Sequence, residues 1–359
     1  MKFIHIADIH FDRPFVNLSD KEGWGDIRRL DQRKTFKKVI EYIKEDNIPY
    51  LFISGDLYEQ NYVKKSTIEY INLLFKEIPD TQIFISPGNH DPFLKNSYYN
   101  QYQWNANVHI FSSDFEKFEF PEVDIYGFGF DNFYCTGCGI ENLKIENKDK
   151  LNICVLHATL NGASLEEKQY NSVSTNILQE KYFDYVALGH IHKTNFQENE
   201  QNNMMYPGSL VSLGFDELGP HGMIEGEIDK QKLSLKFIPL DEKEFVEYKM
   251  DVTDVASKEE LIEKIEEKEF DPKNYVKIIL TGKRNFEINT YEINKIITNE
   301  QVIKIRDKTK IAYDLEKIQN DYTLKGLFAK EMLEMQKNMP EDEQEIIEKA
   351  IEIGFEALQ

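Results

Sequence analysis

Residues 1–10 read MKFIHIADIH, and residues 51–60 read LFISGDLYEQ. In each stretch, a short apolar run typical of a buried strand is followed directly by polar residues. These are Asp8 and His10 in the first stretch and Asp56 in the second. Carboxylates and imidazoles are common metal ligands in proteins, so the sequence places candidate ligands at the ends of two strands.

The same arrangement occurs three more times. Apolar runs at residues 82–85, 153–156 and 185–188 are also typical of buried strands. The polar residues that follow these runs are Asn89, His90, Asp91, His157, His190 and His192. A single histidine or Asp-x-His is more often a surface or core feature than a ligand. Five such clusters, each at a strand end, favour a metal site.

Helical patterns around residues 35–43 and 68–75 lie between the first three predicted strands. Strands that alternate with helices indicate an α/β layered domain. In such domains, sites form beyond the carboxyl ends of the strands, where residues distant in sequence can meet. Glycines 55, 88 and 189 suit tight turns through which the backbone leaves the sheet.

Composition gives broader limits. At about 150 residues per domain, 359 residues favour two domains, and 41% hydrophobic residues are enough for a packed core. The three cysteines, Cys135, Cys138 and Cys154, cannot form a disulfide framework in so long a chain, and we interpret them as reduced thiols. No signal peptide or membrane span is recognisable, so we expect a cytoplasmic protein without membrane contact.

The net charge of −21 is unusual for a protein that handles nucleic acid, because phosphate binding normally relies on basic surface. A basic stretch could contact a DNA backbone or could be a solvated helix face. It consists of Arg28, Arg29, Arg33, Lys34, Lys37 and Lys38. An aromatic group could stack on bases or could pin a loop to the core. It consists of Tyr98, Tyr99, Tyr102 and Trp104.

The five clusters are similar to the motifs of the calcineurin-like metallophosphoesterases, which are D-x-H, G-D, G-N-H-[DE], H and G-H-x-H in that order. Further segments resemble the SbcD type of DNA-repair nuclease subunit, and within it the bacterial YhaO-like branch. They are MKFIHIADIHFDRPF, LFISGDLYEQ, SPGNHDP, ALGHIH, YPGSLVSLGF and TLKGLFAKEML. The resemblance implies an α/β fold with a four-layer β-sandwich flanked by helices, followed by a small α+β capping domain.

The resemblance also implies two divalent metal ions, with manganese expected and iron, zinc or magnesium as alternatives. The first ion would be held by Asp8, His10, His192 and a bridging Asp56. The second would be held by Asp56, Asn89, His157 and His190. Two such ions lower the pKa of the water they share, which supplies a nucleophile near neutral pH.

His90 is expected to be catalytic without being a ligand, by stabilising charge or protonating the leaving oxygen. Glu59 stands where some relatives carry a second catalytic histidine, and we expect it to orient water or a metal-bound histidine. Asp91 could orient His90. Because Pro92 follows it, we favour Asp91 as a helix N-cap instead.

The sequence divides into residues 1–240 as the metallophosphoesterase domain, 241–312 as the α+β cap and 313–359 as amphipathic helices. The cap is predicted from strands at 245–252 and 275–280 and helices at 258–267 and 290–297. The terminal pair is predicted from apolar stripes. These comprise Leu324, Leu327, Phe328, Met332 and Leu333, then Ile347, Ala350, Ile351, Phe355 and Leu358 after Pro340. The stripes could pack together or dock on an SMC-like, SbcC-like ATPase, and we favour docking.

The leading hypothesis is a manganese-dependent DNA exonuclease and endonuclease, the nuclease subunit of a double-strand break repair complex that could also form a homodimer. The alternative enzyme is a phosphatase or phosphodiesterase acting on proteins or small nucleotides. The residues after Asp56 are Leu57, Tyr58 and Glu59, where protein phosphatases have G-D-x-V-D-R-G. A scaffold that had lost its metals would have eroded ligands, and none is missing from the five motifs.

Overall fold

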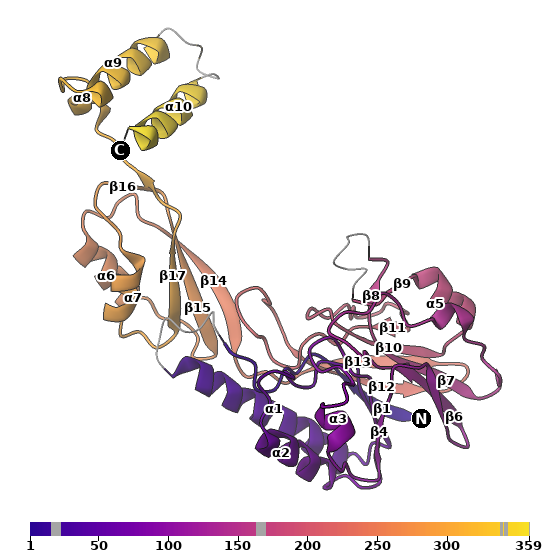
Figure 1. Cartoon of the computed structure of the whole chain (residues 1–359). Coiled ribbons are helices and arrows are strands. Elements are labelled where there is room, and N and C mark those ends of the chain that lie inside the picture. The colour runs from indigo at the N-terminus through magenta and orange to yellow at the C-terminus, as the bar shows by residue number, and fades with distance from the viewer. Residues whose placement is uncertain (16–22, 163–169, 338–339, 341–343, 359) are drawn as a thin grey trace. The chain divides into compact units, whose positions relative to one another are not determined.

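The computed structural model describes residues 1–15, 23–162, 170–337, 340 and 344–358 (Figure 1). The chain forms two compact units. The first comprises residues 1–247, 270–277 and 300–304, and the second comprises residues 248–269, 278–299 and 305–359. The predicted domain boundaries after residues 240 and 312 stay predictions.

The first unit is built on two sheets. The six-stranded sheet has the order β13 (Leu233–Pro239), β12 (Gly222–Ile228), β1 (Lys2–Ile6), β2 (Tyr50–Ile53), β3 (Gln82–Ile85) and β4 (Val108–Ile110). Strands β1 to β4 are parallel, with Ile4 opposite Leu51 and Leu51 opposite Ile83. The carboxyl ends of β1, β2 and β3 therefore lie at one edge of this sheet.

The second sheet contributes two more strand ends. Its order is β11 (Met204–Met205), β10 (Tyr185–Gly189), β7 (Leu151–His157), β6 (Val123–Phe128) and β5 (Glu116–Glu119). Strands β7 and β10 are parallel, with Leu156 opposite Leu188 and His157 opposite Gly189. This register places the last residue of β7 beside the last residue of β10.

The two sheets pack face to face on an apolar core. Phe3 and Phe84 of the first sheet join Ile153 and Tyr185 of the second in one cluster of buried side chains. The rings of Phe3 and Tyr185 have centroids 4.6 Å apart. Burial of such large apolar side chains on both inner faces stabilises a sandwich.

Helices cover the outer faces of this sandwich (Figure 1). α1 (Trp24–Glu45) and α2 (Lys65–Phe75) pack on the six-stranded sheet, and α5 (Thr175–Lys181) packs on the five-stranded sheet. The layers therefore run helix, sheet, sheet, helix, which confirms the predicted α/β sandwich. α3 (Tyr98–Gln101), a 3-10 turn (Ile140–Asn142) and the paired β8 (Thr159–Leu160) and β9 (Ser172–Val173) complete this part.

The predicted strands and the second helix agree with the structure to within about two or three residues. The first helix is longer than the expected 35–43, because it begins at Trp24. Its first turns bury the polar side chains of Arg28 and Gln32 instead of apolar ones. A search for apolar periodicity cannot detect a helix face that is buried through polar contacts.

The C-terminal third contains a three-stranded sheet of order β14 (Glu244–Asp251), β15 (Asn274–Thr281) and β17 (Val302–Asp307). α6 (Lys258–Glu266) and α7 (Thr290–Ile296) begin at the caps Ser257 and Asn289, whose side chains accept a backbone N–H. The short strands β16 (Lys283–Arg284) and β18 (Lys310–Ile311) pair with each other. This α+β composition matches the expectation for the cap.

The last described elements are α8 (Leu315–Ile318), α9 (Leu324–Lys337) and α10 (Gln344–Ala357). Ala329, Ile347, Ile351 and Phe355 form a small buried core between them. Much of the predicted apolar stripes is thus covered by self-packing, the alternative that we did not favour. Leu327 remains exposed at 61%. Among the helices that the structure describes, none is long and apolar enough to cross a membrane.

Candidate metal centre

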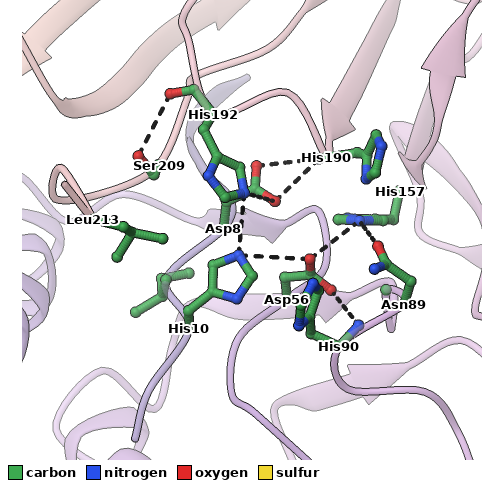
Figure 2. A network of polar contacts seen from close by, with 12 residues as sticks. Asp8, His10, Asp56, Asn89, His90, His157, His190, His192, Ser209 and Leu213 are labelled. Carbon is green, nitrogen blue, oxygen red and sulfur yellow. Dashed lines mark hydrogen bonds and ion pairs between the residues drawn. The ribbon is translucent and has the colours of Figure 1, made fainter. Parts of the chain in front are cut away.

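The predicted ligands meet at the carboxyl ends of the sandwich strands (Figure 2). Asp8 and His10 follow β1, Asp56 follows β2, and Asn89 and His90 follow β3. From the second sheet come His157 at the end of β7 and His190 and His192 after β10. Three groups of His and Asp side chains each bring their potential ligand atoms within 4.8 Å of one another. They are Asp8, His10 and His192, then His10, Asp56 and His90, then Asp8, Asp56 and His157.

His10 and His192 face each other through their Nε2 atoms, because a carboxylate holds the Nδ1 atom of each ring. The Nδ1 of His10 lies 2.9 Å from Glu59 Oε1, and the Nδ1 of His192 lies 2.5 Å from Glu217 Oε1. A carboxylate only accepts, so each Nδ1 donates to its carboxylate, and this contact turns each Nε2 toward the other ring. The two Nε2 atoms are 3.2 Å apart. Burial would lower the pKa of His192, but the bond to Glu217 and the charge of Asp8 raise it to about 9, so in the metal-free protein its Nε2–H can donate to His10 Nε2. A metal ion that displaced this proton would meet both nitrogens, so the pair fits a metal site.

His157 presents its Nε2 to a second group of donor atoms. Its Nδ1 donates to the carbonyl of Ser54 at 2.9 Å, which directs Nε2 into the site. That Nε2 lies 2.9 Å from Asn89 Oδ1 and 3.4 Å from Asp56 Oδ2. An imidazole nitrogen, an amide oxygen and a carboxylate oxygen therefore converge, and this set of donor types also fits a cation.

Asp56 stands between these two groups. Its Oδ2 lies 3.6 Å from His10 Nε2 and 3.4 Å from His157 Nε2. Burial alone would raise the pKa of Asp56, but the charges of His157 and His10 hold that pKa well below its usual range. The geometry thus suits the bridging role that we predicted for this carboxylate.

His190 is the predicted ligand with the weakest structural support. Its backbone N–H donates to both oxygens of Asp8 at 3.1 Å. Its ring centroid lies 5.2 Å from that of His157 and 5.0 Å from that of Tyr170. Burial lowers the pKa of His190 to about 3, so the ring is neutral and can bind a cation. None of the three ligand-atom groups includes it, and its role as a ligand stays a prediction.

The backbone at the site adopts uncommon conformations. Asp8, His10, Asp56 and His190 have φ values of 52°, 54°, 52° and 96°. Left-handed backbone is costly for residues with a side chain, and it concentrates at functional sites where surrounding contacts hold it. Gly189 has a different role from the turn that we expected, because a Cβ there would lie 1.7 Å from the Ser54 carbonyl. The two sheets require glycine at this close approach.

Glu59 connects His10 to His90. Its Oε1 accepts from His10 Nδ1 and its Oε2 from His90 Nδ1, each at 2.9 Å. Burial opposes ionisation, but these two hydrogen bonds lower the pKa of Glu59 to about 2. Burial would lower the pKa of His90, yet the bond to Glu59 and the charge of Asp56 raise it to about 9. Of the two roles expected for Glu59, the contacts favour that of orienting a histidine.

Both roles considered for Asp91 are wrong. No helix starts at Pro92, since residues 92–97 are irregular and α3 begins after Ser97. Asp91 also makes no bond to His90. It accepts instead from the backbone N–H groups of Asp56, Leu57 and Gly88 and from the Tyr99 hydroxyl. This buried carboxylate therefore joins the loops that follow β2 and β3.

Sequence reasoning missed Glu217 and Ser54. Glu217 holds His192 through Nδ1, and Ser54 holds His157 through its carbonyl. A backbone carbonyl leaves no signal in a sequence. Glu217 lies two residues beyond the segment 206–215 that resembles SbcD-type subunits, and that proximity was the available signal.

Most of the candidate DNA-contacting residues already interact with other residues of this chain. Arg28 is buried against Asp241 and the Ser212 carbonyl, and Arg33 pairs with Asp12. Of the remaining basic residues in the stretch, three form ion pairs with acidic neighbours. They are Arg29 with Asp26, Lys37 with Glu41, and Lys38 with Glu242. The aromatic group packs on the core beneath the six-stranded sheet, which favours its pinning role.

A buried set of carboxylate, imidazole and amide-oxygen donors at the strand ends of a two-sheet sandwich suits divalent metal ions and is typical of metal-dependent hydrolases. The chain belongs to the calcineurin-like phosphoesterase family, whose sequence model matches residues 1–194. This family uses a dinuclear divalent metal centre, in keeping with the two groups of donor atoms described above.

Three curated relatives are similar to this chain. The uncharacterized metallophosphoesterase YhaO of Bacillus subtilis is 25% identical over 74% of this chain and 67% of its own length. The SbcD subunit of the nuclease SbcCD from Staphylococcus saprophyticus is 29% identical over 67% of this chain and 69% of its own length. The DNA double-strand break repair protein Mre11 of Methanopyrus kandleri is 23% identical over 62% of this chain and 52% of its own length.

Proposed function

We propose that this chain is a metal-dependent DNA nuclease, with exonuclease and endonuclease activity, that serves as the nuclease subunit of a double-strand break repair complex. The observation that carries the phosphoesterase chemistry is the approach of the Nε2 atoms of His10 and His192 to 3.2 Å, with the Nδ1 of each ring held by a carboxylate. The assignment to DNA rests on relatives named as a nuclease subunit and as a double-strand break repair protein.

Two divalent ions, with manganese expected, would be held by the two groups of donor atoms that share Asp56. Bound there, they would lower the pKa of water and neutralise charge on the phosphoryl oxygens. The first position would use Asp8, His10 and His192, and the second Asn89, His157 and His190. The protein contributes the orientation of these donors through Glu59, Glu217 and Ser54.

His90 supplies the proton in this proposal. Its Nδ1 is fixed by Glu59, and its side chain is 40% exposed although it stands beside Asp56. The other ring nitrogen, Nε2, can therefore meet a substrate and pass a proton to the departing sugar oxygen. Glu59 would orient His90 and stabilise its cationic form through Oε2.

An ATPase partner would bring this acidic chain to DNA. A groove of about 980 Å³ lies within the second unit between β18 and α10. Isoleucines and lysines line it together, including Ile346, Ile353, Lys283, Lys310 and Lys349. An apolar groove that also carries lysines suits an amphipathic, acidic segment such as part of an SMC-like coiled coil.

A phosphatase or phosphodiesterase acting on proteins or small nucleotides is the second candidate, since it would share the five motifs. Cleavage assays separate the two. Purified protein with Mn²⁺ is incubated with end-labelled duplex DNA, end-labelled single-stranded DNA and bis-nitrophenyl phosphate. We expect cleavage of DNA and of the small ester, and turnover of the ester alone would favour the second candidate.

His90→Gln tests the assignment of the proton donor. We expect the variant to keep its bound manganese and to lose about 10²–10⁴-fold in DNA cleavage, the usual contribution of a positioned acid. His109→Gln is the matched control, because His109 packs on Phe84 and bonds to Gln82 outside the site. Undiminished cleavage by His90→Gln would remove His90 from the mechanism.

A further inference from the structure

Glu217 lies outside the five motifs, yet it contacts a candidate ligand directly. Its Oε1 accepts from His192 Nδ1 at 2.5 Å, and its Oε2 accepts from Ser209 Oγ and the Leu213 backbone N–H, each at 2.9 Å. One carboxylate therefore fixes both the histidine ring and the loop of residues 209–217. The backbone N–H of Ser209 also donates to the His192 carbonyl at 2.9 Å, and the Ser209 hydroxyl contacts the same carbonyl beside the site (Figure 2).

The main chain of Glu217 is also held by hydrogen bonds. The Glu217 carbonyl accepts from Ser212 Oγ at 2.8 Å and from His221 Nε2 at 3.0 Å. With both ends of this residue bonded, its carboxylate has little freedom to move independently of the loop. A shift of the loop would be transmitted to the ring of His192.

The loop is in turn held by residues from the start of the three-stranded sheet, all within the first unit. Val211, Leu213 and Phe215 share a buried cluster with Phe245 of β14, Tyr275 of β15 and Ile303 of β17. The rings of Phe215 and Phe245 meet edge to face at 4.9 Å.

A buried arginine also holds the loop of residues 209–217, through polar contacts. The Arg28 guanidinium donates twice to the Ser212 carbonyl, at 2.9 and 2.7 Å, and pairs with Asp241. Asp241 also accepts from the Ser212 backbone N–H at 2.9 Å. Both backbone groups of this loop residue are thus satisfied from outside the loop.

We propose that Glu217 is a positioning residue for His192, and that the loop of residues 209–217 links the affinity of the first metal position to packing at the start of β14, β15 and β17. The inference rests on the proposed metal chemistry and adds to it a dependence on residues that touch no ligand. A rearrangement of these strands would change metal affinity without altering any ligand.

Glu217→Ala tests the positioning role through metal binding, without DNA. Free Mn²⁺ is followed by electron paramagnetic resonance during titration, and bound metal is counted by mass spectrometry. We expect affinity at one of the two positions to fall about 10- to 100-fold, the usual effect of removing a group that orients a ligand.

Glu116→Ala is the matched control for this titration. Glu116 is also half-buried and anchors a loop through the Ser112 N–H and Oγ, at 3.0 and 2.9 Å, but it touches no site histidine. Unchanged Mn²⁺ affinity in Glu217→Ala, or an equal loss in Glu116→Ala, would overturn the positioning role. If the wild-type protein cleaves no DNA but Glu217→Ala still weakens Mn²⁺ binding, this inference stands and the nuclease proposal is refuted.

Phe245→Leu tests the link to the sheet, with Phe75→Leu as its control. Both phenylalanines are buried, but Phe75 packs with α1 and α2 in a cluster that does not include the loop. We expect both variants to lower the melting temperature of the metal-free protein and only Phe245→Leu to weaken Mn²⁺ binding. Equal Mn²⁺ affinities in the two variants would overturn the link.

Discussion

Replacing Glu59 by glutamine exchanges one carboxylate oxygen for an NH₂ group and leaves the size of the side chain nearly unchanged. Glu59 now accepts two hydrogen bonds, from His10 Nδ1 and His90 Nδ1, through separate oxygens 2.9 Å away. Glutamine has one acceptor oxygen, and its NH₂ group must face one of the two rings. Glu59→Gln therefore cannot hold both Nδ1–H groups.

The ring that meets the amide NH₂ determines the outcome. If that ring is His10, its proton moves to Nε2, the atom that lies 3.2 Å from His192 Nε2, and the ring can no longer act as a ligand there. If that ring is His90, metal binding survives and only the oriented cationic form of His90 is lost. Both cases remove one hydrogen bond to a charged group, which contributes about 1.5–3 kcal/mol.

At 1.4 kcal/mol per factor of ten, this loss corresponds to a decrease of about 10- to 150-fold. Mn²⁺ titration of the metal-free variant and its turnover of bis-nitrophenyl phosphate separate the two cases. A decrease in Mn²⁺ affinity identifies His10, and a decrease in turnover at saturating Mn²⁺ identifies His90. Glu116→Gln, which has no site contact, should change neither quantity. Wild-type affinity together with wild-type turnover in Glu59→Gln would refute the role assigned to this carboxylate.

The remaining predictions concern stability and thiol chemistry. Arg28→Met leaves Asp241 buried without its cation, so urea unfolding should show a free energy of unfolding lower by about 3–5 kcal/mol. Arg29→Met, at a partly exposed pair on the same helix, should stay within about 0.5 kcal/mol of wild type, and equal effects would contradict the reasoning. Burial raises the pKa of Cys138 to about 11 and that of Cys154 well above its ordinary value. At pH 8 both thiols should react with a disulfide reagent far more slowly than in guanidinium, and equal rates would show that they are accessible.

The strand ends could be predicted because the signal is local. A buried strand needs a short apolar run, and the residues directly after it are free to be polar. Asp8 and His10 after β1, and Asp56 after β2, show this pattern within ten residues of sequence. The parallel register then follows from the fold class, and it brings residues distant in sequence together.

The partners of these ligands could not be predicted, because they depend on contacts between distant segments. Glu217 meets His192 across 25 residues, and the role of Asp91 requires three backbone N–H groups from two loops. The sequence D-P is typical of a helix start, so local propensity gave a wrong role for Asp91. The tertiary contacts of its carboxylate override that preference.

Several basic side chains of this acidic protein interact with groups of their own chain. Arg28 holds a loop beside the site, Arg33 pairs with Asp12, and Lys38 pairs with Glu242. Such cations neutralise carboxylates of their own chain and contribute little to neutralising phosphates. For the proposed nuclease, attraction of the substrate then falls to the bound metal ions and to a partner. An acidic chain of this design would bind DNA weakly by itself, and its activity would depend on the assembly that delivers the substrate.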